Sequence, residues 1–213
     1  MLCHMTTEMG RRERKKQLTR QAISDLATDL FMARGFDAVT VAEVAAAADV
    51  AVQTVFNHFP TKEDLFFDES GWWTGPAEAV RDTPAGESVV AALRTHYLTE
   101  IRYRYEAGYL ATWAKFRRTI EGSPTLRARR SRNAQEMEDL LVVALRQRDE
   151  QLPELTAHLI AAQYAAAQKV LEAELARVLP ENGSEAELAN AAAAMERAID
   201  EVFGVLSRGL DRA

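Results

Sequence analysis

Two short helical segments separated by a tight turn are the feature that most constrains the fold of this chain. Thr40 and Glu43 have the spacing of a capping box, which predicts a short helix over 41–48. The turn falls at 49–51, and a second short helix over 52–58 ends before the next proline. Two short helices joined in this way predict a helix-turn-helix, whose second helix enters the major groove of DNA.

Helical periodicity continues through the rest of the chain, and strand signals are almost absent. Apolar residues recur with the spacing of one helical face before Gly35, which is expected to end the first helix. After Thr61 and Asp64, which form a second cap, we expect one helix to run toward Val80. With 47% hydrophobic residues the chain has ample material for a core. The sequence therefore predicts an all-α fold of about nine helices.

Charge is unevenly distributed along the sequence. The chain of 213 residues has a formal net charge of −6, yet residues 11–20 hold six basic side chains and one acidic side chain. A second basic run lies at 115–132, and acidic residues concentrate between 172 and 211. A basic N-terminal segment on an otherwise acidic protein is typical of a protein that binds DNA through that segment. The alternative for each basic run is a solvated helix face.

Several classes of protein find no support in the sequence. No run approaches the roughly 20 apolar residues of a bilayer span, and the first ten residues do not form a secretory signal. The single cysteine, Cys3, can make no internal disulfide, and the four histidines form no i, i+4 pair. Nucleotide-binding and nucleophile motifs are absent from the sequence. We expect a cytoplasmic protein that is not an enzyme, with no cofactor, metal or membrane partner.

Several segments of the first 67 residues resemble the TetR family of regulators. They are QAISDLA at 21–27 with 30–31 and 34–36, TVAEVA at 40–45, and VAVQTVFNHF at 50–59 followed by KEDL at 62–65. These segments occur in the order and at the spacing of the family, and together they cover about a quarter of the chain. The resemblance implies an N-terminal three-helix DNA-binding domain at 14–67, preceded by a disordered basic arm at 1–13. It also implies a C-terminal helical ligand-binding and dimerisation domain at 68–213.

The resemblance indicates which side chains meet DNA. We expect base contacts from Gln53, Thr54 and Asn57, because Gln and Asn can bind adenine bidentately. Phosphate contacts are expected from Thr19, Arg20, Thr40, His58 and Lys62, although His58 is equally explained as a packed or capping residue. The arm residues Arg11, Arg12, Arg14, Lys15 and Lys16 would reach the neighbouring minor groove. Their alternative is a disordered, solvated tail.

Three positions depart from the pattern of the family. Asp49 stands where the family has glycine in the turn, and Asp tolerates the left-handed conformation better than most residues. Ala51 replaces a Ser or Thr cap, which removes about 1 kcal/mol of local helix support. Phe56 replaces a tyrosine whose hydroxyl commonly contacts phosphate in the family. These three departures keep open a second interpretation of the chain, as a helical small-molecule-binding or interaction protein with degraded DNA recognition.

By the same resemblance, the last two helices form a homodimer. The expected interface residues are Leu159, Ala166, Val170, Met195, Ile199, Val202, Phe203 and Leu206. The alternative for this apolar set is a core within one chain. A twofold dimer places its recognition helices about 34 Å apart, which predicts a palindromic operator.

The middle of the chain is rich in aromatic residues. We expect an effector pocket lined by Trp72, Trp73, Tyr97, Tyr103, Tyr109, Trp113, Phe116 and Arg117. Aromatic-lined cavities suit apolar or amphipathic ligands, whereas the alternative is an ordinary core. The segment 116–129 resembles TetR-type regulators associated with acyl thioesters, which implies a long-chain acyl effector. The function expected is a ligand-responsive repressor, released from a palindromic operator when the effector shifts the helix expected over 62–80.

Overall fold

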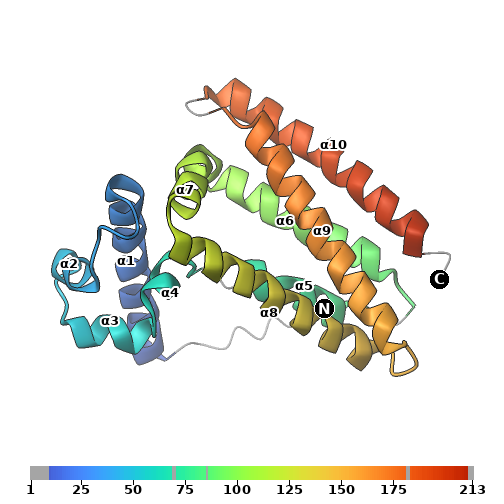
Figure 1. Ribbon diagram of the computed structural model, residues 1–213, viewed down its shortest axis with the longest axis horizontal. Coiled ribbons are helices and arrows are strands. Elements are labelled where there is room, and N and C mark those ends of the chain that lie inside the picture. The colour runs from blue at the N-terminus through green and yellow to red at the C-terminus, as the bar shows by residue number, and fades with distance from the viewer. Residues whose placement is uncertain (1–9, 69–70, 85, 181–182, 211–213) are drawn as a thin grey trace. The chain divides into compact units, whose positions relative to one another are not determined.

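The computed structural model describes residues 10–68, 71–84, 86–180 and 183–210, and these residues form helices and turns with no strand (Figure 1). The predicted all-α class is therefore confirmed. Ten helices occur among the described residues, where about nine were expected. The chain divides into two compact units, residues 1–68 with 119–126 and residues 69–118 with 127–213.

Unit 1 contains one long helix and three short helices within the first 68 residues. They are α1 (Arg11–Arg34), α2 (Val41–Ala47), α3 (Val52–His58) and α4 (Lys62–Phe66). Helix α1 ends at Gly35, whose φ of 86° lies in the left-handed region that favours glycine. The buried residues of this unit include Ile23, Ala27, Phe31, Phe36, Val39, Val44, Val55, Phe59 and Leu65. Both expected capping boxes are present, Thr40 with Glu43 before α2 and Thr61 with Asp64 before α4.

Two expected boundaries in this region are wrong. The segment after Thr61 forms two helices, α4 and then α5 (Gly71–Asp82), in place of one continuous helix. The backbone leaves the helical conformation at Phe67, with φ −103° and ψ 44°. Helix α1 begins at Arg11, so the expected arm residues from Arg11 to Lys16 form the first turns of a helix. The remainder of the expected arm, 1–9, lies outside the described residues.

Unit 2 is built from longer helices. They are α5, α6 (Val89–Glu106), α7 (Leu110–Gly122), α8 (Pro124–Arg148), α9 (Glu154–Val178) and α10 (Glu185–Leu210). Helix α10 packs beside both α9 and α6, and α5 packs against α6 (Figure 1). The core includes Tyr97, Ile101, Leu141, Tyr164, Leu171, Met195, Ile199 and Phe203. Gly75 allows the close approach of α5 to α6, since a Cβ there would lie 2.3 Å from the ring of His96.

The turn between α7 and α8 belongs to unit 1, although most of both helices belongs to unit 2. Ile120, Ser123 and Leu126 of this turn are buried. Ser123 Oγ accepts a hydrogen bond from the backbone N–H of Leu126 at 3.3 Å, and Pro124 is the first residue of α8. This cap satisfies one of the N–H groups that the first turn of a helix leaves without an internal partner.

Candidate nucleic-acid interface

Helix α3 presents amide side chains on the face opposite its buried anchor. Val55 is buried in the core of unit 1, whereas Gln53 and Asn57 are exposed and Thr54 is half-buried. Gln53 Nε2 donates a hydrogen bond to Asn57 Oδ1 at 3.1 Å. Because this bond joins neighbouring turns of one helix, the two amides form a small polar platform. Such amides have the donors and acceptors that base edges require.

The turn before α3 depends on Asp49. Its φ of 53° places it in the left-handed region, as the sequence predicts. The backbone N–H of Val50 donates to the carbonyl of Ala45 at 3.0 Å, which closes the turn onto α2. Ala51 is the N-cap of α3 and makes no side-chain cap, which confirms the expected loss. Phe56 is exposed on α3.

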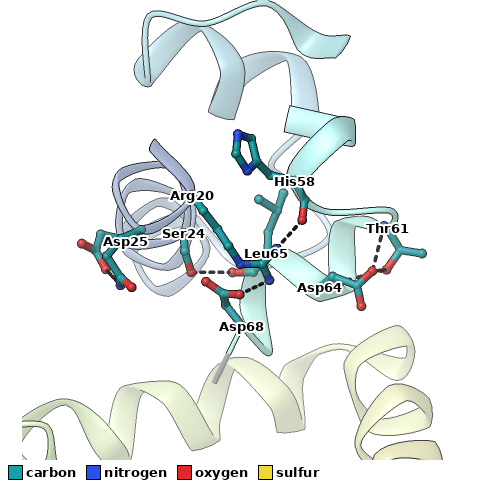
Figure 2. Close-up of polar contacts among 9 residues, drawn as sticks. Arg20, Ser24, Asp25, His58, Thr61, Asp64, Leu65 and Asp68 are labelled. Atoms are coloured by element: carbon teal, nitrogen blue, oxygen red, sulfur yellow. Dashed lines mark hydrogen bonds and ion pairs between the residues drawn. The ribbon is translucent and has the colours of Figure 1, made fainter. Parts of the chain in front are cut away.

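The C-terminal end of α3 is fixed by Arg20 of α1. Figure 2 shows the guanidinium of Arg20 between two partners, the backbone carbonyl of His58 and the carboxylate of Asp68, and it donates to both. The guanidinium carbon also lies 4.3 Å from the centre of the Phe59 ring, within the range of a cation–π contact. Ser24 Oγ on the same helix donates to the carbonyl of Leu65 at 3.4 Å. Helix α1 thereby holds α3 and the end of α4 together.

These contacts give Arg20 a role within the protein. Two of its nitrogens are engaged by protein groups, and Asp68 compensates its charge. Arg20 therefore positions α3, and the phosphate contact expected of it stays a prediction. The sequence did not indicate this role, because Asp68 lies 48 residues from Arg20 and belongs to no motif in the sequence.

Lys62 is also engaged within the protein. Its Nζ donates to the carbonyl of Phe36 at 2.6 Å and lies 4.2 Å from the centre of the Phe36 ring. Burial lowers the pKa of the Lys62 ammonium below its usual value. This bond joins the start of α4 to the segment after α1, and the phosphate contact expected of Lys62 stays a prediction.

The other expected phosphate contacts differ in their surroundings. Thr19 Oγ1 donates to the carbonyl of Lys15 at 3.0 Å, within α1. The Thr40 hydroxyl belongs to the capping box of α2 and donates to Glu43 at 2.9 Å. Burial, then the charges of Arg20 and Lys16, lower the pKa of the His58 imidazole. His58 is thus partly packed, which favours the alternative weighed for it.

The first turns of α1 carry a group of exposed cations. Arg14, Lys15 and Lys16 are exposed there, and the charge of Lys16 acts on His58 near the end of α3. The positive charge of α1 therefore acts at the end of α3 that carries His58. Non-specific attraction to DNA phosphates requires cations that are exposed on the surface of the protein.

The residues expected to line the effector pocket do not form one buried group. Tyr97 is buried, but Tyr103 and Tyr109 are 54% and 45% exposed and contact each other edge to face at 6.1 Å. The buried face of α6 carries Tyr97, Ile101 and Arg104, so Tyr103 and Tyr109 lie outside the core, and their place in a pocket stays a prediction. Trp73, Trp113, Phe116 and Arg117 are partly buried, and Trp113 stacks on Phe116 at 5.8 Å. The side chain of Trp72 lies outside the described residues.

The expected interface residues separate into two sets. Met195, Ile199 and Phe203 of α10 are buried within the chain itself, so their assignment to an interface is corrected. Val202 and Leu206 are partly buried against the same core. On α9, Leu159 and Val170 are 53% and 56% exposed, and Ala166 is exposed between them.

Two features are absent from the described part of the chain. Within it, none of the helices is both long enough and apolar enough for a bilayer span. Across the same residues, no three His, Cys, Asp or Glu side chains gather where they could hold a metal ion.

The chain is similar to known regulators in sequence. The family described as "Bacterial regulatory proteins, tetR family" matches residues 23–68, the segment that contains α2, α3 and α4. The HTH-type transcriptional regulator TcmR of Streptomyces glaucescens is 31% identical over 146 residues. That alignment covers 65% of this chain and 64% of TcmR, so the chain spans less than two thirds of this relative.

Solved structures share the fold at lower identity. The SmeT–triclosan complex has a TM-score of 0.56 and 18% identity, covering 89% of this chain and 91% of SmeT. Salmonella enterica GusR has a TM-score of 0.51 and 16% identity, covering 88% and 96% of the two chains. Native NalD, the secondary repressor of the MexAB-OprM multidrug efflux pump in Pseudomonas aeruginosa, has a TM-score of 0.50 and 22% identity, covering 86% and 97%. In its helix-turn-helix segment the chain is thus similar to the TetR family of bacterial regulatory proteins, and it shares its fold with these solved structures.

Proposed function

We propose that this protein is a cytoplasmic, ligand-responsive repressor that binds a palindromic operator as a homodimer. The observation that carries the proposal is the arrangement of α3. Val55 anchors this helix in the core, Arg20 fixes its C-terminal end, and Gln53 and Asn57 face outward with free hydrogen-bonding capacity. A helix held in this way keeps its base-reading side chains in a constant position.

Base recognition is assigned to the exposed amides. Gln53 and Asn57 each have a donor and an acceptor that can meet the N6 and N7 groups of adenine in the major groove. Thr54, half-buried beside them, adds a hydroxyl and a methyl group at the same face. Each good bidentate contact discriminates against a wrong base by about 1–3 kcal/mol. Phosphate attraction is assigned to the exposed Arg14, Lys15 and Lys16 of α1.

The homodimer is assigned to the outer face of α9. Leu155, Leu159 and Val170 are exposed there, and the small residues Ala162 and Ala166 lie between them. Their spacing places all five on one stripe of the helix. Alanine among larger residues lets helices of two chains approach closely, as in a four-helix interface. A twofold axis between two such chains gives operator half-sites about 34 Å apart.

The effector is assigned to unit 2. The SmeT structure is a complex with triclosan, a small molecule, and it shares the fold of this chain. By analogy, a small apolar or amphipathic compound would bind in the helical bundle here, and a long-chain acyl compound stays a prediction within that class. The effector acts only through its different affinities for the DNA-bound and free conformations.

The test is a selection of sequences from random DNA at physiological salt, with the purified protein. We expect an inverted repeat, and loss of its selective binding in the double variant Gln53→Ala and Asn57→Ala. The control is Gln135→Ala on α8, where Gln135 and Asp139 form a similar exposed i, i+4 pair at 3.1 Å. Binding that is indifferent to sequence would instead favour a helical ligand-binding or interaction protein with degraded DNA recognition. The salt dependence alone cannot distinguish them, since phosphate contacts occur in both kinds of binding.

A further inference from the structure

A shallow groove lies where α8 ends and α9 begins. Its volume is about 570 Å³, and its lining residues are Val142, Val143, Arg146, Gln147, Glu150 and Glu154. Val143 is 49% exposed, so the groove does not enclose a bound molecule as a typical ligand pocket does. An open groove that includes exposed apolar side chains suits the surface of another protein.

The groove carries more negative than positive charge. Glu150 and Glu154 are exposed, and Arg146 is the one basic residue among the six that line the groove. Glu154 Oε2 lies 3.9 Å from Arg146 Nη1, and Glu154 Oε1 lies 4.0 Å from His158 Nε2. Both distances exceed the roughly 2.7–2.9 Å of a charge-assisted hydrogen bond. Glu154 can therefore accept a closer cation from another surface.

The exposed side of α9 continues from this groove along the helix. Its exposed apolar residues form a stripe of Leu155, Leu159, Ala162, Ala166 and Val170. The first four follow one another at separations of four, three and four residues, which is the spacing of a seam along which a second helix packs. The charge is reversed at the far end of the stripe, where Lys169 is exposed. The stripe thus has an acidic end at the groove and a basic end at Lys169.

This stripe is complementary to itself in the antiparallel direction. A twofold axis brings the same patch of two chains together, so that each contact occurs twice. An axis beside the middle of the stripe places Leu155 of one copy opposite Val170 of the other, and Lys169 beside the acidic groove. Ala162 and Ala166 then lie at the centre, where small residues let the two helices approach closely. A parallel pair would instead bring like charges together.

We propose that the groove between α8 and α9 receives Lys169 and Val170 of a second copy of this chain, and that charge fixes the antiparallel register of the homodimer. This inference rests on the proposed function, which includes a homodimer, and it extends the interface from α9 to Val143 of α8. Glu150 and Glu154 determine specificity, because they favour this register over a parallel one.

The first test reverses the charge at each end of the stripe. Lys169→Glu, and separately Glu150→Lys together with Glu154→Lys, should each weaken the dimer at least about tenfold, since repulsion replaces attraction twice in each dimer. An equimolar mixture of the two variants should form heterodimers with nearly the native affinity, because opposite charges then meet at both ends. Analytical ultracentrifugation at low salt measures all three.

The control for the first test is Arg132→Glu, a charge reversal at an exposed position of α8 outside the groove, which should leave the dimer unchanged. Heterodimer formation also shows that both variants are folded. Undisturbed homodimers of the two variants, or a mixture that gives no heterodimer, would overturn the proposal.

The second test measures the register by cross-linking. Leu155→Cys with Val170→Cys, in a chain whose single cysteine Cys3 is replaced by serine, should give a disulfide-linked dimer on mild oxidation. The two positions lie about 22 Å apart along one helix, so a disulfide within one chain is excluded. Either substitution alone should give no linked dimer, because the antiparallel register separates identical positions. Linkage through Leu155→Cys alone would show a parallel register, and a dimer in which the double variant does not link would have another interface.

The two proposals fail in different ways. None of the substituted positions on α8 and α9 belongs to unit 1, so the variants keep the DNA-reading surface intact. A dimer that selects an inverted repeat but fails both tests would overturn the register and leave the regulator standing. A cross-linked antiparallel dimer that selects no DNA sequence would do the reverse. A chain that is monomeric at every concentration would overturn the homodimer and its register together.

Discussion

Ser123 Oγ donates a hydrogen bond to Asp37 Oδ1 at 2.9 Å, which joins the α7–α8 turn to the connection between α1 and α2. The same hydroxyl caps α8 through Leu126. Asp37 follows Phe36, whose carbonyl accepts the bond from Lys62 at the start of α4. One buried serine therefore connects the start of α8 to the segment that also holds α4.

Ser123→Ala should destabilise the protein more than an ordinary loss of a cap. It removes the cap of α8 and leaves Asp37 without this donor, so we expect a loss of about 2–3 kcal/mol in the free energy of unfolding. The matched control is Ser88→Ala, since Ser88 caps α6 by the same kind of bond at 3.3 Å and should cost about 1 kcal/mol. Urea unfolding measures both. Equal losses would show that the bond to Asp37 contributes nothing.

Arg20→Lys should weaken operator binding without changing its salt dependence. A lysine cannot reach the carbonyl of His58 and Asp68 together, so α3 loses its support while phosphate contacts remain. Lys16→Ala is the comparison, because loss of a phosphate contact should reduce the slope of log K against log salt by about 1. Filter binding at several salt concentrations measures both variants. A reduced slope for Arg20→Lys would restore Arg20 to the phosphate contacts.

Leu159→Glu should convert a dimer into monomers without unfolding the chain. The side chain is 53% exposed within one protomer, so a charge there costs little until a second copy covers it. Light scattering after size exclusion gives the mass, and circular dichroism checks the fold. Thr95→Glu on an exposed face of α6 is the control and should leave the mass unchanged. A dimer that persists in Leu159→Glu would place the interface elsewhere.

The capping box of α2 should make stability depend on pH in the acid range. Hydrogen bonds from the Thr40 backbone and the Arg34 side chain lower the pKa of Glu43 from 4.5 to about 2. A lowered carboxyl pKa contributes stability above the unfolded value of 4.5, and this contribution is lost as the pH falls toward 2. The Tm difference between the native sequence and Glu43→Gln should therefore narrow from pH 5 to pH 2. Glu138→Gln on α8 provides the comparison, and a constant difference for Glu43→Gln would contradict the assignment.

Local features of the fold were predictable because neighbouring residues determine them. The box of Thr40 and Glu43, the end of α1 at Gly35 and the left-handed Asp49 each depend on a few adjacent residues. The exposed amides of α3 followed from the same local spacing, since Val55 marks the buried side of the helix. The capping box, Gly35 and the exposed amides lie in the segments that resemble the family, whereas Asp49 is a departure from its pattern.

Long-range packing determined the burial and the contacts that the sequence did not predict. The sequence by itself determined most of the helices, the caps of α2 and α4 and the outward face of α3, through interactions within one or two helical turns, but it did not predict the break between α4 and α5. It placed both Leu159 and Met195 on apolar stripes, but only tertiary packing decided that Leu159 is exposed and Met195 buried. Likewise, only the folded chain brings Arg20 to Asp68 and Ser123 to Asp37. The physical reason is that burial and long-range hydrogen bonds depend on which helix faces meet, and periodicity identifies an apolar face without naming its partner.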